Sequence, residues 1–110
     1  MIIDSHCHLT YEPMSKALKD TIDRANKDGI KYILTISTVD KSFEQILKIV
    51  NGYESVYGTY GIHPHEAKSH QHIKSDDIIN KVNQNKKIIG IGETGLDFYY
   101  NHSEKKDQIY

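Results

Sequence analysis

The residues best suited to chemistry lie near the start of the chain, in the segment 3–9 (IDSHCHL). If this segment is a strand, alternate residues share a face, so Asp4, His6 and His8 point one way and Cys7 the other. Two neighbouring imidazoles can direct their lone pairs at one divalent metal ion. Asp4 could then accept the remaining ring N–H of a ligand. A partly exposed strand end with two solvated imidazoles explains the same pattern, and Cys7 fits a small buried side chain.

Two later segments add residues that could take part in chemistry, GIHPH (61–65) and GIGETGLDFYY (90–100). Glu93 ends a strand-like stretch, where its carboxylate is well placed to bind a metal ion or to bridge two. His63 precedes a proline, which keeps it extended, so it can contact a substrate or only shape a loop. Asp97 is equally well explained as a helix-capping acid. The remaining histidines fit solvated loop positions: His65, His70, His72 and His102.

The elements that must position these residues follow from two apolar periodicities. Branched and apolar residues predict strands over 1–9, 30–39, 55–62 and 87–93. Three- and four-residue apolar spacing predicts helices between Pro13 and Gly29, from an N-cap at Asp40 to Gly52, after a cap at Ser75, and again from residue 103. Gly90 and Gly92, inside the fourth strand, predict a close approach by another group.

This alternation predicts an α/β fold with parallel strands and right-handed crossovers. Two architectures fit it, a small open doubly wound sheet or the first half of a (β/α)8 barrel. In both, the active site lies at the carboxyl ends of the strands. His6, His8, His63 and Glu93 all fall there, and this coincidence favours a metal site more than the His-x-His spacing could alone.

Composition limits the classes of function. The chain of 110 residues forms at most one domain, and its net charge of −1 comes with no basic block, which argues against a dedicated DNA-binding module. It does not exclude an enzyme that holds a phosphate through a metal ion. A single cysteine leaves no intrachain disulfide. Because no leader-like start and no long apolar segment is visible, we expect no membrane association and a cytoplasmic location.

As a set, IDSHCHL, GIHPH and GETGLDFYY resemble the markers of the TatD family of metal-dependent deoxyribonucleases, in the right order and over the whole chain. The resemblance implies that residues 1–110 form the N-terminal half of a TIM-type (β/α)8 barrel, with four parallel strands and intervening helices. It implies that His6 and His8 bind one divalent ion, that Glu93 bridges to a second, and that His63 lies near a substrate phosphate. The ions would be Zn²⁺, Mn²⁺ or Mg²⁺, and the substrate would be DNA.

The resemblance also carries alternatives, because such barrels run to about 250 residues and take further ligands from later strands. We therefore expect the 110 residues alone to be inactive or incomplete, with no catalytic base assigned. One alternative is a non-catalytic remnant of a truncated hydrolase gene. Another is an amidohydrolase that cleaves C–N bonds, although that group bridges its metals with a modified lysine where Glu93 stands. Half a barrel would leave an inner face uncovered, which predicts self-association or pairing with a complementary fragment.

Overall fold

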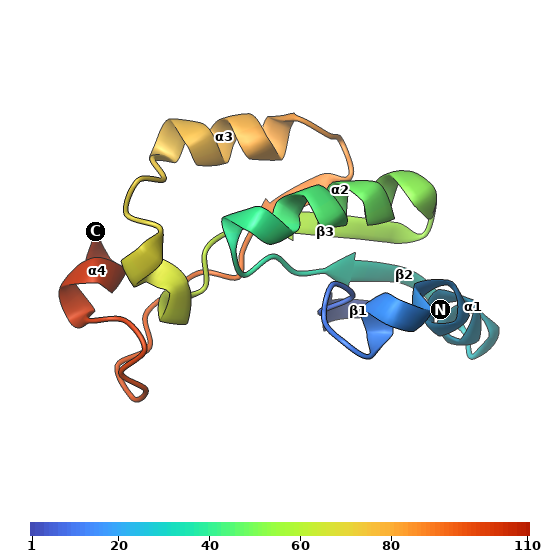
Figure 1. Cartoon of the computed structure of the whole chain (residues 1–110). Coiled ribbons are helices and arrows are strands. Elements are labelled where there is room, and N and C mark those ends of the chain that lie inside the picture. Colours follow the sequence, from blue (N-terminus) through green and yellow to red (C-terminus); the bar gives the residue numbers. More distant parts are fainter.

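A computed structural model describes all 110 residues, and its centre is one parallel sheet (Figure 1). The strands are β1 (Ile2–Cys7), β2 (Ile30–Thr35), β3 (Val56–Tyr60) and β4 (Ile88–Ile91), in the order β1-β2-β3-β4. The α-helices are α1 (Leu18–Lys27), α2 (Phe43–Gly52), α3 (Ser75–Asn83) and α4 (Lys105–Ile109). Short 3₁₀ helices are η1 (Met14–Ala17), η2 (Asp40–Ser42) and η3 (Pro64–Ser69).

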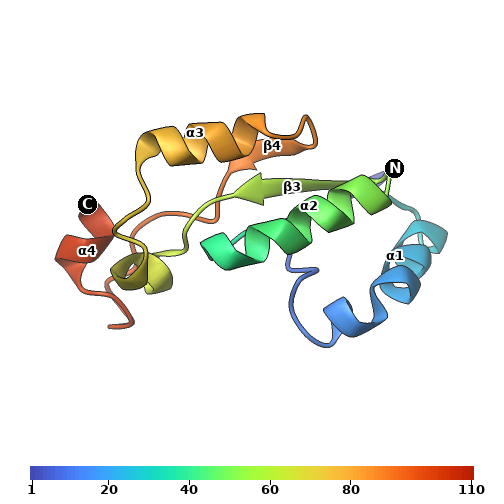
Figure 2. The same cartoon turned by 45° about the horizontal axis from the view of Figure 1, so that its top comes forward.

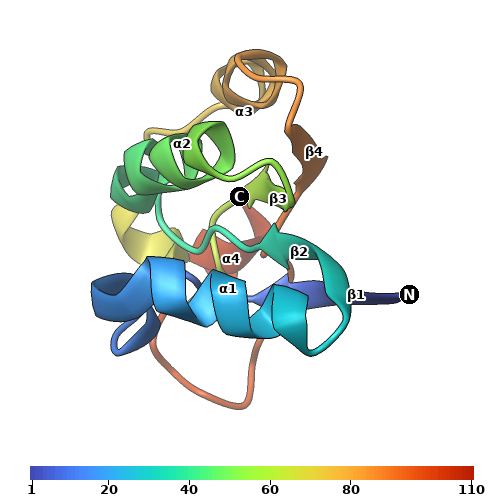
Figure 3. The ribbon, with the colours of Figure 1, turned by 90° about the vertical axis from the view of Figure 1, so that its right-hand side faces the viewer.

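The core lies between the sheet and the three crossover helices. Phe43, Ile46 and Val50 recur at helical spacing on α2 and are buried against Val56 of β3 and Ile33 of β2. Figures 2 and 3 show that α1, α2 and α3 lie on the same side of the sheet, as right-handed crossovers between consecutive strands require.

The opposite face of the sheet is uncovered. Ile3, Tyr32, Ile89 and Ile91 lie on β1, β2 and β4, and each side chain is exposed. In a doubly wound sheet, helices would cover both faces and the strand order would reverse at a switch point. Consecutive strand order with helices on one side is instead the arrangement of one half of a (β/α)8 barrel, as predicted. The outer edges of β1 and β4 have no partner strand.

Close backbone approaches occur at other glycines than those expected. A Cβ atom at Gly61 would lie 2.6 Å from the backbone of Gly92, and one at Gly58 would lie 2.6 Å from Ile46. Gly92 itself would meet nothing within 4 Å, and Gly90 makes only an ordinary contact. The predicted close approach therefore occurs at the end of β4, but the glycine that it requires is Gly61 at the end of the neighbouring strand and not Gly90 or Gly92. Gly61 is the position that allows the ends of β3 and β4 to meet.

Several predicted boundaries were too generous. Each strand is shorter than expected, because its predicted carboxyl end continues as an irregular loop. Asp40 does not cap α2, since its carboxylate accepts a hydrogen bond from the Tyr60 hydroxyl at 2.6 Å. Ser75 is the first residue of α3 rather than its cap, and the Asp77 carboxylate accepts the Lys74 N–H there. None of the helices is both long and apolar enough to cross a membrane.

Candidate metal centre

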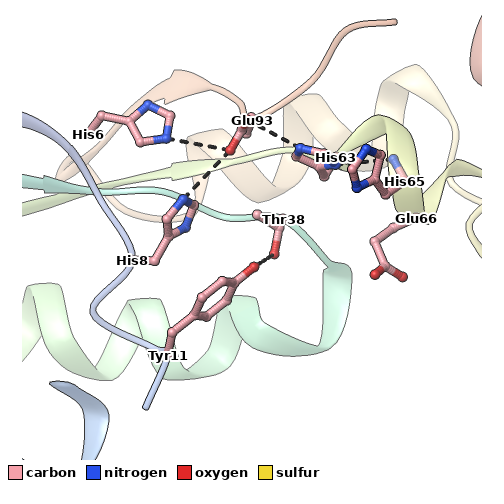
Figure 4. A pocket seen from close by; sticks show the side chains of 8 residues that line it. All are labelled: His6, His8, Tyr11, Thr38, His63, His65, Glu66 and Glu93. Carbon is pink, nitrogen blue, oxygen red and sulfur yellow. Dashed lines mark hydrogen bonds and ion pairs between the residues drawn. The ribbon is translucent and has the colours of Figure 1, made fainter. Parts of the chain in front are cut away.

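A cavity of about 330 Å³ opens at the carboxyl ends of the four strands (Figure 4). Seven of its eight lining residues are histidines, carboxylates or a threonine: His6, His8, Thr38, His63, His65, Glu66 and Glu93. The eighth is Tyr11. The structure therefore brings together all four residues that the sequence predicted for the site, from the ends of β1, β3 and β4.

His6, His8 and Glu93 form a cluster that could hold a metal ion. Nε2 of His6 lies 3.5 Å from Oε2 of Glu93, and Nε2 of His8 lies 3.8 Å from the same oxygen. One ligand atom from each of the three residues lies within 4.8 Å of the other two. Figure 4 shows both imidazoles pointing at the carboxylate from one side.

These distances fit a bound cation better than they fit hydrogen bonds. Ligand atoms about 2.1 Å from a tetrahedral ion lie about 3.4 Å apart, close to the separations seen here. A direct hydrogen bond would bring nitrogen and oxygen to about 2.9 Å. Two imidazole nitrogens, one carboxylate oxygen and an open position make up a ligand set that catalytic zinc uses. The residues present therefore fit a divalent ion.

Main-chain hydrogen bonds from neighbouring strands hold Glu93 in place. Its N–H donates to the Ser37 carbonyl at 2.6 Å, and the Thr59 hydroxyl donates to the Gly92 carbonyl at 2.6 Å. The Ser37 N–H in turn donates to the Thr59 hydroxyl oxygen at 3.2 Å. Ser37 and Thr59 are buried. The sequence analysis assigned no role to Ser37 or Thr59, so their part in positioning Glu93 was missed; small polar residues at the ends of apolar strand segments are the signal that could have shown it.

Packing, rather than a carboxylate, orients His8. Its ring stacks on Tyr11 with centroids 4.7 Å apart, and the Tyr11 and Thr38 hydroxyls are hydrogen-bonded at 2.7 Å. Nδ1 of His8 is buried without a hydrogen-bond partner. The expectation that Asp4 would accept a ring N–H is wrong: its carboxylate accepts the main-chain N–H of His6 at 3.1 Å. A register shift between Asp4 and Cys7 interrupts the strict alternation on which that expectation rested.

Cys7 takes no part in the cluster. It packs against the hydrophobic core, and its thiol donates to the Leu34 carbonyl at 3.7 Å. Burial raises the pKa of the Cys7 thiol to about 12, and the nearby Asp4 carboxylate adds to the shift. Cys7 is half-buried against the core, which agrees in packing with the small buried side chain expected from the sequence.

His63 offers an N–H group to the cavity. Its Nδ1 accepts the main-chain N–H of His65 at 3.1 Å, so a neutral His63 ring carries its proton on Nε2. That Nε2 faces Oε1 of Glu93 at 3.4 Å, on the opposite side of the carboxylate from His6 and His8. A protonated ring nitrogen cannot bind a metal ion, but it can donate a hydrogen bond to an anionic oxygen.

Beyond His63, His65 and Asp97 form a close pair that the sequence did not predict. The His65 Nε2–H donates to Oδ2 of Asp97 at 2.6 Å. This hydrogen bond, with smaller contributions from the main-chain N–H groups of Tyr100 and Tyr99, lowers the pKa of the Asp97 carboxyl below its usual range. The Ser103 hydroxyl donates to the His65 carbonyl at 2.9 Å. Asp97 is thus a loop anchor, and neither a helix cap nor a metal ligand.

Comparison with known proteins gives a family for this arrangement. The sequence model of the family described as "TatD related DNase" matches residues 3–110. An "Uncharacterized metal-dependent hydrolase" of Buchnera aphidicola (subsp. Baizongia pistaciae) is 37% identical over 111 residues, which cover 97% of this chain and 41% of the relative. The "3'-5' ssDNA/RNA exonuclease TatD" of Salmonella typhimurium is 33% identical over 107 residues, with coverage of 97% and 41%. The chain thus spans about two fifths of the length of the curated relatives it matches.

Solved structures agree with the fold. The TatD homologue YjjV of Escherichia coli superposes with a TM-score of 0.76 at 25% identity, over 98% of this chain and 42% of its own. A TatD family hydrolase of Entamoeba histolytica superposes with a TM-score of 0.85 at 23% identity, with the same coverage, and shows the fold alone. The predicted half of a TIM-type barrel is therefore confirmed. With its motifs, its fold and a family match over nearly all its residues in agreement, this chain belongs to the TatD-related DNase family.

Proposed function

We propose that this chain carries the first part of the active site of a metal-dependent hydrolase that cleaves phosphodiester bonds in DNA. The observation that carries the proposal is the convergence of His6, His8 and Glu93 at metal-ligand spacing, with the His63 N–H beside them. The names of the relatives, a metal-dependent hydrolase and an ssDNA/RNA exonuclease, support the same class of reaction.

In this proposal, His6, His8 and Glu93 hold a divalent ion. Two nitrogen ligands favour Zn²⁺ or Mn²⁺ over Mg²⁺, which prefers oxygen ligands throughout. The second ion that the family resemblance implies would share the Glu93 carboxylate. When bound, such an ion polarises the phosphate and lowers the pKa of a water molecule.

His63 contributes substrate binding. Its Nε2–H is fixed by the hydrogen bond that Nδ1 accepts, and it points into the cavity beside Glu93. A phosphate oxygen at this position would accept that N–H, which orients the scissile group relative to the ligand cluster. A Lys or Arg is not needed for this contact, in keeping with the cavity lining, which contains neither.

Titration calorimetry with Zn²⁺ and with Mn²⁺ tests the metal site. The chain is expected to bind either ion, and the double variant H6A/H8A is expected to lose this binding. H72A is the matched control, because His72 is exposed and outside the cavity. Equal binding by the chain and by H6A/H8A would contradict the proposal.

We expect no detectable cleavage of single-stranded DNA by these 110 residues alone, because the family resemblance implies further metal ligands on later strands, and no residue here is assigned as the catalytic base. The alternative is a non-catalytic remnant of a truncated hydrolase gene. Metal-dependent cleavage that E93Q abolishes would show that the chain is sufficient for catalysis and would exclude that alternative. An amidohydrolase activity is disfavoured, because a glutamate occupies the end of β4 where a modified lysine would be expected.

The uncovered face of the sheet is an apolar surface suited to packing against further secondary structure. We propose that further βα units, in the same polypeptide or a complementary one, pack on Ile3, Tyr32, Ile89 and Ile91, since the chain spans about two fifths of its relatives. Light scattering of the 110-residue chain tests this. We expect the chain alone to be a monomer, and its mass to rise when a polypeptide with those units is added. A stable dimer of the chain by itself would assign the face to a second copy. A cytoplasmic location stays a prediction from the sequence.

A further inference from the structure

Exposed aromatic residues lie directly beside the cavity. Phe98, Tyr99 and Tyr100 follow one another in the loop between β4 and α4, which is drawn in orange to red in Figure 1. Their exposed fractions are 50%, 84% and 53%. Contiguous exposed aromatic surface on a folded loop is uncommon unless something binds there. The loop lies at the carboxyl ends of the strands, on the same side as the cavity.

The backbone that carries the two tyrosines is held rigidly. Oδ1 of Asp97 accepts the main-chain N–H groups of Tyr99 and Tyr100 at 3.0 and 3.3 Å, while Oδ2 binds His65. Gln108 holds the main chain of Asp97 on both sides, accepting its N–H at 2.7 Å and donating to its carbonyl at 2.8 Å. A ligand that binds these rings therefore has little loop entropy to overcome.

Aromatic contacts connect the tyrosines to the phosphate end of the cavity. The rings of Tyr99 and Tyr100 are perpendicular, with centroids 4.8 Å apart. Tyr100 contacts His65 edge to face at 5.6 Å, and His65 contacts His63 at 4.4 Å. A group bound at His63 is thus separated from Tyr100 by one imidazole ring.

We propose that Tyr99 and Tyr100 form a nucleobase subsite, named here the aromatic shelf. The base of the nucleotide next to the phosphate at His63 stacks on one ring and meets the edge of the other. Because every base has a face that can stack, the shelf accepts any base, and it requires that base to be unpaired. The His102 ring lies 5.8 Å from that of Tyr100 and borders the shelf. This inference rests on the proposed function, and it adds a base-binding subsite to the phosphate-binding position at His63.

The test compares two fluorescently labelled strands of equal length, an oligothymidylate and an abasic strand with the same phosphates, by anisotropy in the presence of Mn²⁺. Y99A/Y100A is expected to weaken oligothymidylate binding about tenfold or more, which is the usual loss for a stacked base. Its binding of the abasic strand is expected to stay unchanged. Y99F/Y100F keeps the stacking faces and is expected to bind both strands as the unsubstituted chain does. Circular dichroism checks that each variant is folded.

H63A separates this inference from the function on which it rests. Weaker binding of both strands by H63A, with no base-dependent loss in Y99A/Y100A, would overturn the shelf and leave the phosphate site intact. A base-dependent loss in Y99A/Y100A, with no effect of H63A on either strand, would support the shelf and overturn the role of His63. Equal weakening of both strands by Y99A/Y100A would make the tyrosines structural, and no binding of either strand by the unsubstituted chain would overturn both proposals.

Discussion

The two ends of the cavity use the same chemical groups in opposite ways. At one end, the imidazoles of His6 and His8 stand 3.5 and 3.8 Å from the Glu93 carboxylate. At the other end, the imidazole of His65 donates to the Asp97 carboxylate at 2.6 Å. The first set leaves a space of ionic size between its members, and the second closes that space with a hydrogen bond. Spacing, rather than residue type, therefore separates a ligand site from a structural pair.

The difference extends to the surroundings of each carboxylate. Both oxygens of Asp97 are engaged, one by His65 and one by main-chain N–H groups. The Glu93 side chain makes no close hydrogen bond, although its backbone is held firmly by Ser37. A fixed backbone with an unengaged carboxylate is the arrangement that a metal ligand needs, because its lone pairs remain free.

The largest effect is expected at Glu93. E93Q replaces an anionic ligand with a neutral amide, and we expect the affinity for Zn²⁺ or Mn²⁺ to fall about 100-fold or more, since even substitutions beside a ligand typically cost 10- to 100-fold. Calorimetry measures it. E66Q changes a carboxylate that lines the same cavity outside the three-ligand cluster, and it is expected to leave the affinity unchanged. A similar loss of metal affinity in E93Q and E66Q would contradict the assignment of Glu93, rather than any carboxylate of the cavity, as the ligand.

The next largest effect is expected at Gly61, where the ends of β3 and β4 approach each other closely. A Cβ atom at Gly61 would lie 2.6 Å from the Gly92 backbone, so G61A forces the ends of β3 and β4 apart. We expect the free energy of unfolding to fall by about 1–3 kcal/mol, the usual cost of overpacking. Urea titration measures it. G52A is the control, because a Cβ atom there meets nothing within 4 Å, and its stability is expected to be unchanged or slightly raised, since alanine favours the helix that Gly52 ends.

A smaller, pH-dependent effect is expected at the Asp97 end. The pKa of Asp97 is lower in the folded chain, so its ionised form contributes stability that is complete above the unfolded value of about 3.9 and is lost as the pH falls through the lowered folded value. The protection factors of the Tyr99 and Tyr100 amide hydrogens, which correct for the pH dependence of intrinsic exchange, are expected to fall only in that acidic range, as NMR can follow. D97N is expected to exchange fast at every pH, whereas D107N is expected to match the unsubstituted chain.

The smallest effect concerns the support of His8. Y11F removes the hydrogen bond between the Tyr11 and Thr38 hydroxyls and keeps the ring on which His8 stacks. We expect a loss of about 1 kcal/mol or less in the free energy of unfolding, with metal affinity nearly unchanged. A large loss of metal affinity in Y11F would mean that the hydroxyl, rather than the stacked ring, orients His8.

The sequence predicted the cluster of His6, His8 and Glu93 better than the pair of His65 and Asp97, for physical reasons. His6, His8 and Glu93 were found because strand periodicity and the rule for parallel sheets bring strand ends to one edge. His65 and Asp97 meet through the paths of two loops, and loop paths depend on contacts such as that of Ser103 with His65, which no periodicity encodes. His65 was accordingly assigned to solvent.

Local register explains the other errors. Asp4 was predicted to support a ring because strict alternation placed it beside His6, and the shift before Cys7 cannot be read from residue types. Ser37 was passed over because a small polar residue at a strand end carries no chemistry of its own, although its carbonyl holds Glu93. The parallel strands with intervening helices, in contrast, follow from the βα rhythm and were correct. That rhythm left two architectures open, and the family resemblance selected the half barrel.

The position of the ligand cluster has a consequence for the shape of the sheet. His6 and His8 lie at the end of β1, Glu93 follows β4, and these are the two outermost strands of the sheet. An ion bound between the three side chains would be a removable crosslink from the first strand to the last. Such a crosslink would limit the curvature of the sheet at one edge and would raise the melting temperature with the logarithm of the free ion concentration once the site is near saturation. Removal of the ion by a chelator would then loosen the whole sheet. The concentration of free metal would thereby affect how easily another strand pairs with the open edges of β1 and β4.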